Sequence, residues 1–184
     1  MGVDMKKFAF FTFFSALLFA SISAAAQAKP AAVASVDLQK YAGTWYEIAR
    51  FPNKFQKKCV GNITAVYTGK SNGDLGVVNQ CIGSDGLTQS YKSDARVVDK
   101  ATNAKLKGGW GDYWIIDLDP KYQYAAVSDS KGETLWILGR AAKMSDAVYQ
   151  GILRRIETMG FNPGKLARTP QNVEIVKGAV IEKP

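Results

Sequence analysis

The chain from Tyr41 onward is built of short segments in which apolar and polar residues alternate. Clusters of Gly, Asn, Asp and Pro separate these segments, for example at Asn72-Gly73 and at Asp119-Pro120. Eight strands are predicted in this way, at 43–51, 60–68, 75–81, 88–98, 104–108, 113–118, 122–128 and 134–139. Short strands at this spacing indicate an antiparallel sandwich or barrel. Eight strands in a barrel leave room for packed side chains or for one small ligand.

After the last of these strands, the spacing of the apolar residues changes. Apolar residues recur at helical spacing, and charged residues lie between them. Ser145 is the predicted N-cap, Asp146 complements the positive end of the helix dipole, and Gly160 ends the helix, which therefore spans about 145–159. The predicted apolar stripe consists of Val148, Ile152, Leu153, Ile156 and Met159. This stripe predicts a helix that packs on an apolar surface.

The first 28 residues have the pattern of an export signal. Lys6 and Lys7 precede the apolar run 8–20, and Ala26-Gln27-Ala28 is a cleavage site of small residues. The run is shorter than the roughly 20 apolar residues of a membrane-spanning helix. We therefore predict a cleaved signal peptide at 1–28, a flexible arm at 29–36 and a single domain at 37–184.

Three motifs resemble those of a known family. Gly43-Thr44-Trp45, continued as Tyr46-Glu47-Ile48-Ala49-Arg50, closely resembles the opening strand of the lipocalins, and of their bacterial branch in particular. The segment 135–140, Leu-Trp-Ile-Leu-Gly-Arg, and the turn 118–122, Leu-Asp-Pro-Lys-Tyr, are similar to two further lipocalin signatures. The resemblance implies an all-β fold: an eight-stranded antiparallel up-and-down barrel with the C-terminal helix packed outside.

The chain departs from the family pattern at three places. The turn has Leu118 where the family usually has Thr. The segment around 107–112 is shorter than in anchored bacterial relatives. The bacterial branch is usually lipid-anchored through a Cys at the cleavage point, whereas no Cys precedes Cys59 here. The expectation is a protein that is soluble after export.

The resemblance also implies how one end of the barrel is closed. Strand alternation places Trp45 on the inner face, and Arg140, which follows the neighbouring last strand, can lie across its ring in a cation–π contact. Gly43, Asp119 and Tyr122 are expected at the same closed end. Glu47 has the same inward parity as Trp45 and should be tied to donors at the base of the barrel, because a buried carboxylate needs partners.

For the cavity wall, the resemblance points to Tyr113 and Trp136, which fall where similar bacterial proteins have ligand-contacting aromatics. Strand parity adds Ala49, Phe51, Val77, Asn79, Ala95, Val97 and Leu138. Each of these could instead be simple core, because an eight-stranded barrel can fill itself with side chains.

Cys59 and Cys81 are the only cysteines, and they flank a predicted hairpin. Export would place them in an oxidising compartment, so we predict a disulfide. The alternative is a nucleophilic Cys59, because some enzymes with this fold use a cavity thiol. The chain has no His, which excludes a Ser-His-Asp site, an imidazole metal site and an activating imidazole for that thiol. No metal or cofactor is expected.

The net charge of the full chain is +8, and loss of residues 1–28 removes Lys6, Lys7 and Asp4 to leave +7. The basic residues are spread along the chain rather than clustered, which argues against nucleic acid and allows weak, transient contact with anionic membrane surfaces.

The predicted function is binding, storage or transport of a fatty acid or lysophospholipid in the cell envelope, without enzymatic activity. The expected location is the periplasm or the exterior, with peripheral association with the outer membrane, and the expected state is a monomer or a homodimer. The alternatives are the thiol enzyme and an integral eight-stranded outer-membrane barrel.

Overall fold

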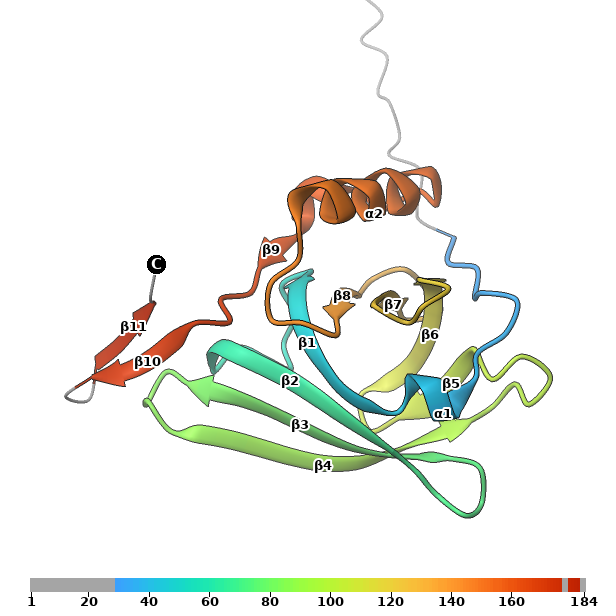
Figure 1. Ribbon diagram of the computed structural model, residues 1–184, viewed down its shortest axis with the longest axis horizontal. Helices are drawn as coiled ribbons and strands as arrows, with labels where there is room; N and C mark the ends of the chain where they lie inside the picture. Colours follow the sequence, from blue (N-terminus) through green and yellow to red (C-terminus); the bar gives the residue numbers. More distant parts are fainter. Residues whose placement is uncertain (1–28, 177–178, 183–184) are drawn as a thin grey trace, which may run out of the picture.

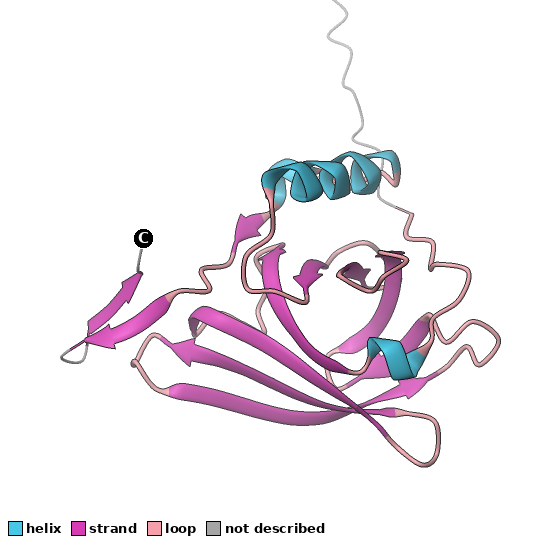
Figure 2. Ribbon diagram, in the orientation of Figure 1, coloured by secondary structure: helices cyan, strands magenta, loops and turns pink. Residues whose placement is uncertain are grey.

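The computed structural model describes residues 29–176 and 179–182, so the predicted signal peptide lies outside the described residues. Strands β1 to β8 form a barrel (Figure 1; Figure 2). Their bounds are β1 Gly43–Arg50, β2 Cys59–Gly69, β3 Leu75–Gly83, β4 Thr88–Val97, β5 Lys105–Gly108, β6 Gly111–Leu118, β7 Tyr124–Ser128 and β8 Leu135–Gly139. Each neighbouring pair is antiparallel, and β1 pairs with both β2 and β8, which closes the barrel. The predicted fold class is confirmed.

All eight predicted segments are strands, and their ends differ from the prediction by no more than two residues. The largest shifts occur next to turns. Tyr122 was placed at the start of a strand, but it has a positive φ of 58° and belongs to the turn before β7. Left-handed backbone of this kind is uncommon for a bulky residue, so alternation alone could not have located it.

A bulge in β1 changes which side chains face the interior. Glu47 pairs with Leu138 on β8, but the next pair is Ala49 with Ile137, so one extra residue stands between them. Beyond this point the inward parity is reversed. Ala49 and Phe51 therefore face the outer apolar layer, which corrects the prediction that they line the cavity.

The apolar residues form two layers. The inner layer lies inside the barrel and includes Trp45, Leu75, Leu106 and Ile115. The outer layer lies between the barrel wall and α2, which spans Asp146–Thr158 (Figure 2). The helix is thus packed outside the barrel, as expected.

Ser145 caps α2, as the sequence predicts, by accepting a hydrogen bond from the Val148 backbone N–H. The buried face of the helix differs from the predicted stripe, because Tyr149, Ile152 and Ile156 are buried while Val148 is 40% exposed. Ile152 and Ile156 are completely buried, and each contributes about 1.5–3 kcal/mol to holding the helix on the barrel. Arg155 adds an ion pair of 2.9 Å to Asp117 on β6.

Segment 29–36, predicted to be a flexible arm, is packed against the barrel. The backbone N–H of Val33 donates to the carbonyl of Ile115 at 2.9 Å, and that of Val36 donates to Thr102 at 2.7 Å. Val36 is only 3% exposed. The segment leads into α1 (Leu38–Tyr41), a short helix capped by Asp37 that lies at one end of the barrel (Figure 1).

The C-terminal extension returns to the barrel before it leaves it. After η1 (Pro163–Lys165), strand β9 (Ala167–Arg168) pairs with β1. Strands β10 (Val173–Val176) and β11 (Ala179–Glu182) form a separate hairpin that projects from the barrel (Figure 1). The Asn62 side chain on β2 holds the start of this hairpin through two hydrogen bonds with the Val173 backbone.

Candidate ligand-binding cavity

One end of the barrel is sealed by Arg140 and Trp45. The Arg140 guanidinium lies 3.9 Å from the centroid of the Trp45 ring, and Trp45 is completely buried. The guanidinium also donates hydrogen bonds to the backbone carbonyls of Tyr122, Thr44, Lys40 and Tyr41. The Trp45 indole N–H donates to the Tyr41 carbonyl at 2.8 Å. One side chain thus ties together α1, β1 and the turn before β7.

Other residues predicted for the closed end lie around this contact. Gly43 has a φ of +101°, and a Cβ there would stand 3.2 Å from Arg140 Nη1, so the position favours glycine. Asp119 Oδ2 accepts hydrogen bonds from the backbone N–H groups of Lys121 and Gln123, which fixes the turn despite the missing Thr. The Tyr122 hydroxyl accepts a hydrogen bond from the Asp37 backbone N–H at 2.9 Å.

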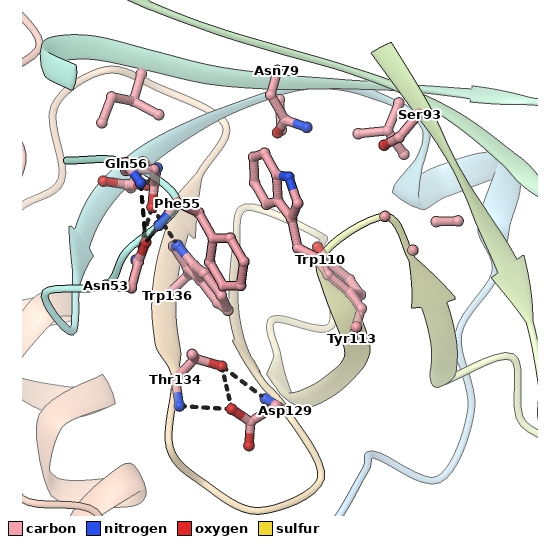
Figure 3. A pocket seen from close by; sticks show the side chains of 18 of the residues that line it. Asn53, Phe55, Gln56, Asn79, Ser93, Trp110, Tyr113, Asp129, Thr134 and Trp136 are labelled. Carbon is pink, nitrogen blue, oxygen red and sulfur yellow. Dashed lines mark hydrogen bonds between the residues drawn. The ribbon is translucent and has the colours of Figure 1, made fainter. Parts of the chain in front are cut away.

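Above this seal lies a cavity of about 470 Å³, within the range of about 300–1,000 Å³ that is usual for small-molecule sites. Its wall comes from the inner faces of the strands, and its mouth from the β1–β2 loop, the β5–β6 turn and the β7–β8 turn. Figure 3 shows the rings of Phe55, Trp110 and Trp136 in this space, with Asn79 on β3 and Ser93 on β4 facing it. The barrel is therefore a cup with one open end.

Six of the nine residues predicted for the wall line this cavity: Val77, Asn79, Ala95, Tyr113, Trp136 and Leu138. Val97 belongs to the inner apolar layer but is not part of the cavity wall, because it lies near the closed end of β4, where the layer is solid. Ala49 and Phe51 lie on the other side of the barrel wall because of the β1 bulge. That the six residues contact a ligand stays a prediction.

Trp136 is held by a chain of buried polar groups. Its indole N–H donates to Gln56 Oε1 at 3.0 Å, and the Gln56 amide donates to Glu47. Glu47 is 3% exposed and also accepts hydrogen bonds from Arg50 and from Thr169. The partners of Glu47 thus come from β1 itself, from the loop at the open end and from the C-terminal extension, not from the base of the barrel as predicted. The network fixes the Trp136 ring and the β1–β2 loop together.

Three tyrosine hydroxyls meet at the deep end of the cavity. Tyr113 Oη lies 2.7 Å from Tyr41 Oη and 2.9 Å from Tyr67 Oη. Tyr41 is completely buried beneath the cavity, whereas Tyr67 and Tyr113 line it. Burial raises the pKa of Tyr67 to about 12, and burial likewise raises the pKa values of Tyr41 and Tyr113 well above their usual range. All three hydroxyls are therefore protonated at neutral pH.

Sequence reasoning missed Tyr67, although a signal was present. Ile63, Ala65 and Tyr67 alternate along β2 and are all buried, so strand parity places Tyr67 inside. Tyr41 gave no such signal because it lies in a helix of only four residues.

Aromatic rings from three segments stack at the mouth. The Trp110 ring on the β5–β6 turn lies between Phe55 of the β1–β2 loop and Tyr91 of β4, with centroid distances of 5.7 Å on both sides. Phe55 and Trp110 also line a second cavity of about 450 Å³, next to Lys54, Lys57 and Lys58. The sequence predicted the turn that contains Trp110 but not the stacking of its ring on Phe55 and Tyr91.

Cys59 and Cys81 form a disulfide between β2 and β3, with a Cα–Cα distance of 5.7 Å, so the predicted pairing is confirmed. Both residues line the second cavity. The chain contains no other cysteine. Residues 29–176 and 179–182 contain no cluster of side chains suited to a metal ion, and none of their helices has the length and apolar character needed to span a membrane.

The closed barrel, the seal at one end and the open cavity are together typical of proteins that bind small hydrophobic molecules. The sequence comparison agrees, because a model of the lipocalin-like domain matches residues 36–171. The chain therefore belongs to the lipocalin family.

Two relatives show which members of this family the chain is similar to. Temperature-induced lipocalin-1 of Arabidopsis thaliana is 33% identical, over 76% of this chain and 82% of the relative. The outer membrane lipoprotein Blc of Escherichia coli K12 is 35% identical, over 72% of this chain and 78% of Blc. Among solved structures, the cockroach allergen Per a 4 has a TM-score of 0.59 at 20% identity and covers 77% of this chain and 94% of its own, which shows the shared fold.

Proposed function

We propose that this protein binds one fatty acid or lysophospholipid in the cell envelope, with the acyl chain in the cavity and the headgroup at the open end. The observation that carries this proposal is the cavity itself, sealed by Trp45 and Arg140 at one end and open at the other. Each methylene moved from water into such a space contributes about 0.8 kcal/mol. A long acyl chain therefore provides enough binding free energy without any covalent chemistry.

The side of the mouth formed by the β1–β2 loop suits a headgroup that carries negative charge, whereas Asp112, Asp129 and Glu133 place the opposite charge elsewhere on the rim. Lys54 lines both cavities, and Lys57 and Lys58 lie beside it at the second one. Opposite charges attract across the partly exposed rim, and salt screens this attraction. The same lysines support transient contact with anionic membrane surfaces during loading or release.

The proposed location is the periplasm or the exterior, with peripheral association with the outer membrane. Support comes from the name of the bacterial relative, an outer membrane lipoprotein, and from the signal-like pattern of residues 1–28. A role in the storage or transport of lipid for the envelope is consistent with this location. We propose a monomer or a homodimer as the working unit.

The two alternatives are supported less well. A thiol enzyme would need a free Cys59, which is in a disulfide. An integral outer-membrane barrel would have to expose an apolar band to lipid, whereas part of this barrel is covered by α2. Purification without detergent tests the second alternative.

The proposed function is tested by calorimetric titration of hexadecanoic acid and of a lysophospholipid with the same chain into Trp136→Ala. Trp136 lines the cavity, so its loss should cost about 2 kcal/mol of binding free energy, which is roughly a 30-fold weaker Kd. The matched control is Trp114→Ala, since Trp114 packs against the outer layer. Native mass spectrometry of the protein from its own cells should show one bound lipid. Equal affinity of Trp136→Ala and the parent would contradict the wall assignment.

A further inference from the structure

The tyrosine cluster at the deep end of the cavity has one more hydrogen-bond donor than the cluster itself can use. Tyr41, Tyr67 and Tyr113 each supply one O–H, and each oxygen has two lone pairs. Two hydrogen bonds join the three hydroxyls, with Tyr113 in the centre. Two of the three protons are used, and these hydroxyls make no further hydrogen bond to the described residues.

The place of the third proton follows from burial. Tyr67 donates to Tyr113. If Tyr113 donated to Tyr41, the remaining O–H would be on Tyr41, which is completely buried and does not line the cavity. A buried donor without an acceptor is strongly disfavoured. If Tyr41 donates to Tyr113, the remaining O–H is on Tyr113, which lines the cavity. The second arrangement is therefore the more stable one.

We propose that Tyr113 Oη donates a hydrogen bond to an uncharged oxygen at the buried end of the ligand, so that the preferred ligand has an oxygen at both of its ends. This inference rests on the proposed lipid-binding function and deepens it. A hydroxyl, ketone or ester oxygen satisfies Tyr113, while the second polar group of the ligand stays at the mouth near Lys54. A plain acyl chain would leave the donor without an acceptor.

The environment explains why the oxygen is uncharged. The site offers one O–H, whereas a buried carboxylate needs several donors or an opposite charge. Burial raises the pKa of the neighbouring Tyr67 to about 12, which shows that this part of the barrel disfavours anions. The positive charge that acts on Tyr41 is that of Arg140, and its guanidinium already donates to four backbone carbonyls at the closed end.

The test uses two ligands of equal length, hexadecanoic acid and its ω-hydroxy derivative. In an apolar cavity without a polar partner, the terminal hydroxyl would weaken binding by about tenfold or more, because it would be buried unpaired. In the native protein we expect the Kd of the ω-hydroxy acid to lie within about threefold of that of hexadecanoic acid, or below it. Isothermal titration calorimetry measures both values.

Three variants locate the effect. Tyr113→Phe should bind the ω-hydroxy acid about tenfold more weakly than hexadecanoic acid. Tyr67→Phe removes a hydroxyl but keeps the surplus donor, because Tyr41 and Tyr113 still share one hydrogen bond, so the ratio of the two Kd values should stay near that of the native protein. Tyr46→Phe, which removes a hydroxyl from the outer layer, is the folding control.

The outcomes separate the inference from the function on which it rests. If neither ligand binds the native protein, the proposed lipid-binding function fails. If hexadecanoic acid binds and the ω-hydroxy acid binds tenfold more weakly, only the inference is overturned. An unchanged ratio in Tyr113→Phe, or an equal loss in Tyr67→Phe, overturns it as well. Should Tyr113→Phe not fold, the comparison of the two ligands on the native protein still decides.

Discussion

Removal of the Arg140 side chain tests how the closed end is held. The guanidinium donates to four backbone carbonyls that belong to three separate segments, and it covers the Trp45 ring at 3.9 Å. In Arg140→Met, water can donate hydrogen bonds to these carbonyls instead, because this end of the barrel is partly exposed. Each lost hydrogen bond therefore costs about 0.5 kcal/mol, the low end of the usual range. The cation–π contact adds about 1 kcal/mol. The expected loss is about 3 kcal/mol of unfolding free energy.

For a domain of this size, such a loss lowers Tm by about 6–12 °C. Circular dichroism on heating and urea unfolding followed by tryptophan fluorescence measure the change. Arg140→Lys should recover less than half of the loss, because an ammonium cannot reach four carbonyls at once. The control is Arg154→Met on the exposed face of α2, which should change stability by no more than about 0.5 kcal/mol. A Tm of Arg140→Met equal to that of the control would refute the reasoning.

Two further predictions concern the disulfide and the tyrosine cluster. Cys59→Ser combined with Cys81→Ser should lower the unfolding free energy by about 3 kcal/mol, measured by urea unfolding, and thiol titration of the denatured, unreduced parent should find no free thiol. Because burial raises the pKa of Tyr67 to about 12, its folded pKa lies above the unfolded value of about 10. The stabilisation that the protonated Tyr67 hydroxyl gives to the folded state is fully present below about pH 10 and is lost as the pH rises toward 12. The unfolding free energy measured across this window should therefore fall. Ultraviolet titration should show the three clustered tyrosines ionising only well above the usual pH range of a tyrosine.

The strands were predictable because their alternation is regular and their turns carry Gly, Asn, Asp and Pro. In β1, alternation predicted the wrong face for Ala49 and Phe51, because a bulge after Glu47 reverses the parity and moves both residues to the outside. A bulge leaves no mark in this sequence, since Ile48 and Ala49 are apolar and suit either side. Parity was sufficient elsewhere, for example at Val77 and Asn79 on β3.

Contacts between distant segments could not be predicted from local pattern. The stack of Phe55, Trp110 and Tyr91 joins two turns and a strand. The docking of segment 29–36 depends on backbone hydrogen bonds to Ile115 and Thr102, for which a small, Pro-containing stretch gives no signal. Closure at Arg140 and Trp45 was foreseen only because the family resemblance linked the first and last strands of the barrel.

The pairing of β1 with β8 sets the order in which this protein can fold. Tyr46 near the start of the barrel pairs with Gly139 at its end, so the seam joins residues that are far apart in sequence. Strands β2 to β8 can pair with their predecessors as they are synthesised, but β1 keeps one edge open until β8 exists. Contacts of such long range form slowly, because the chain between them must first be ordered. The nascent chain is consequently most exposed to proteases and to aggregation just before its last barrel strand emerges.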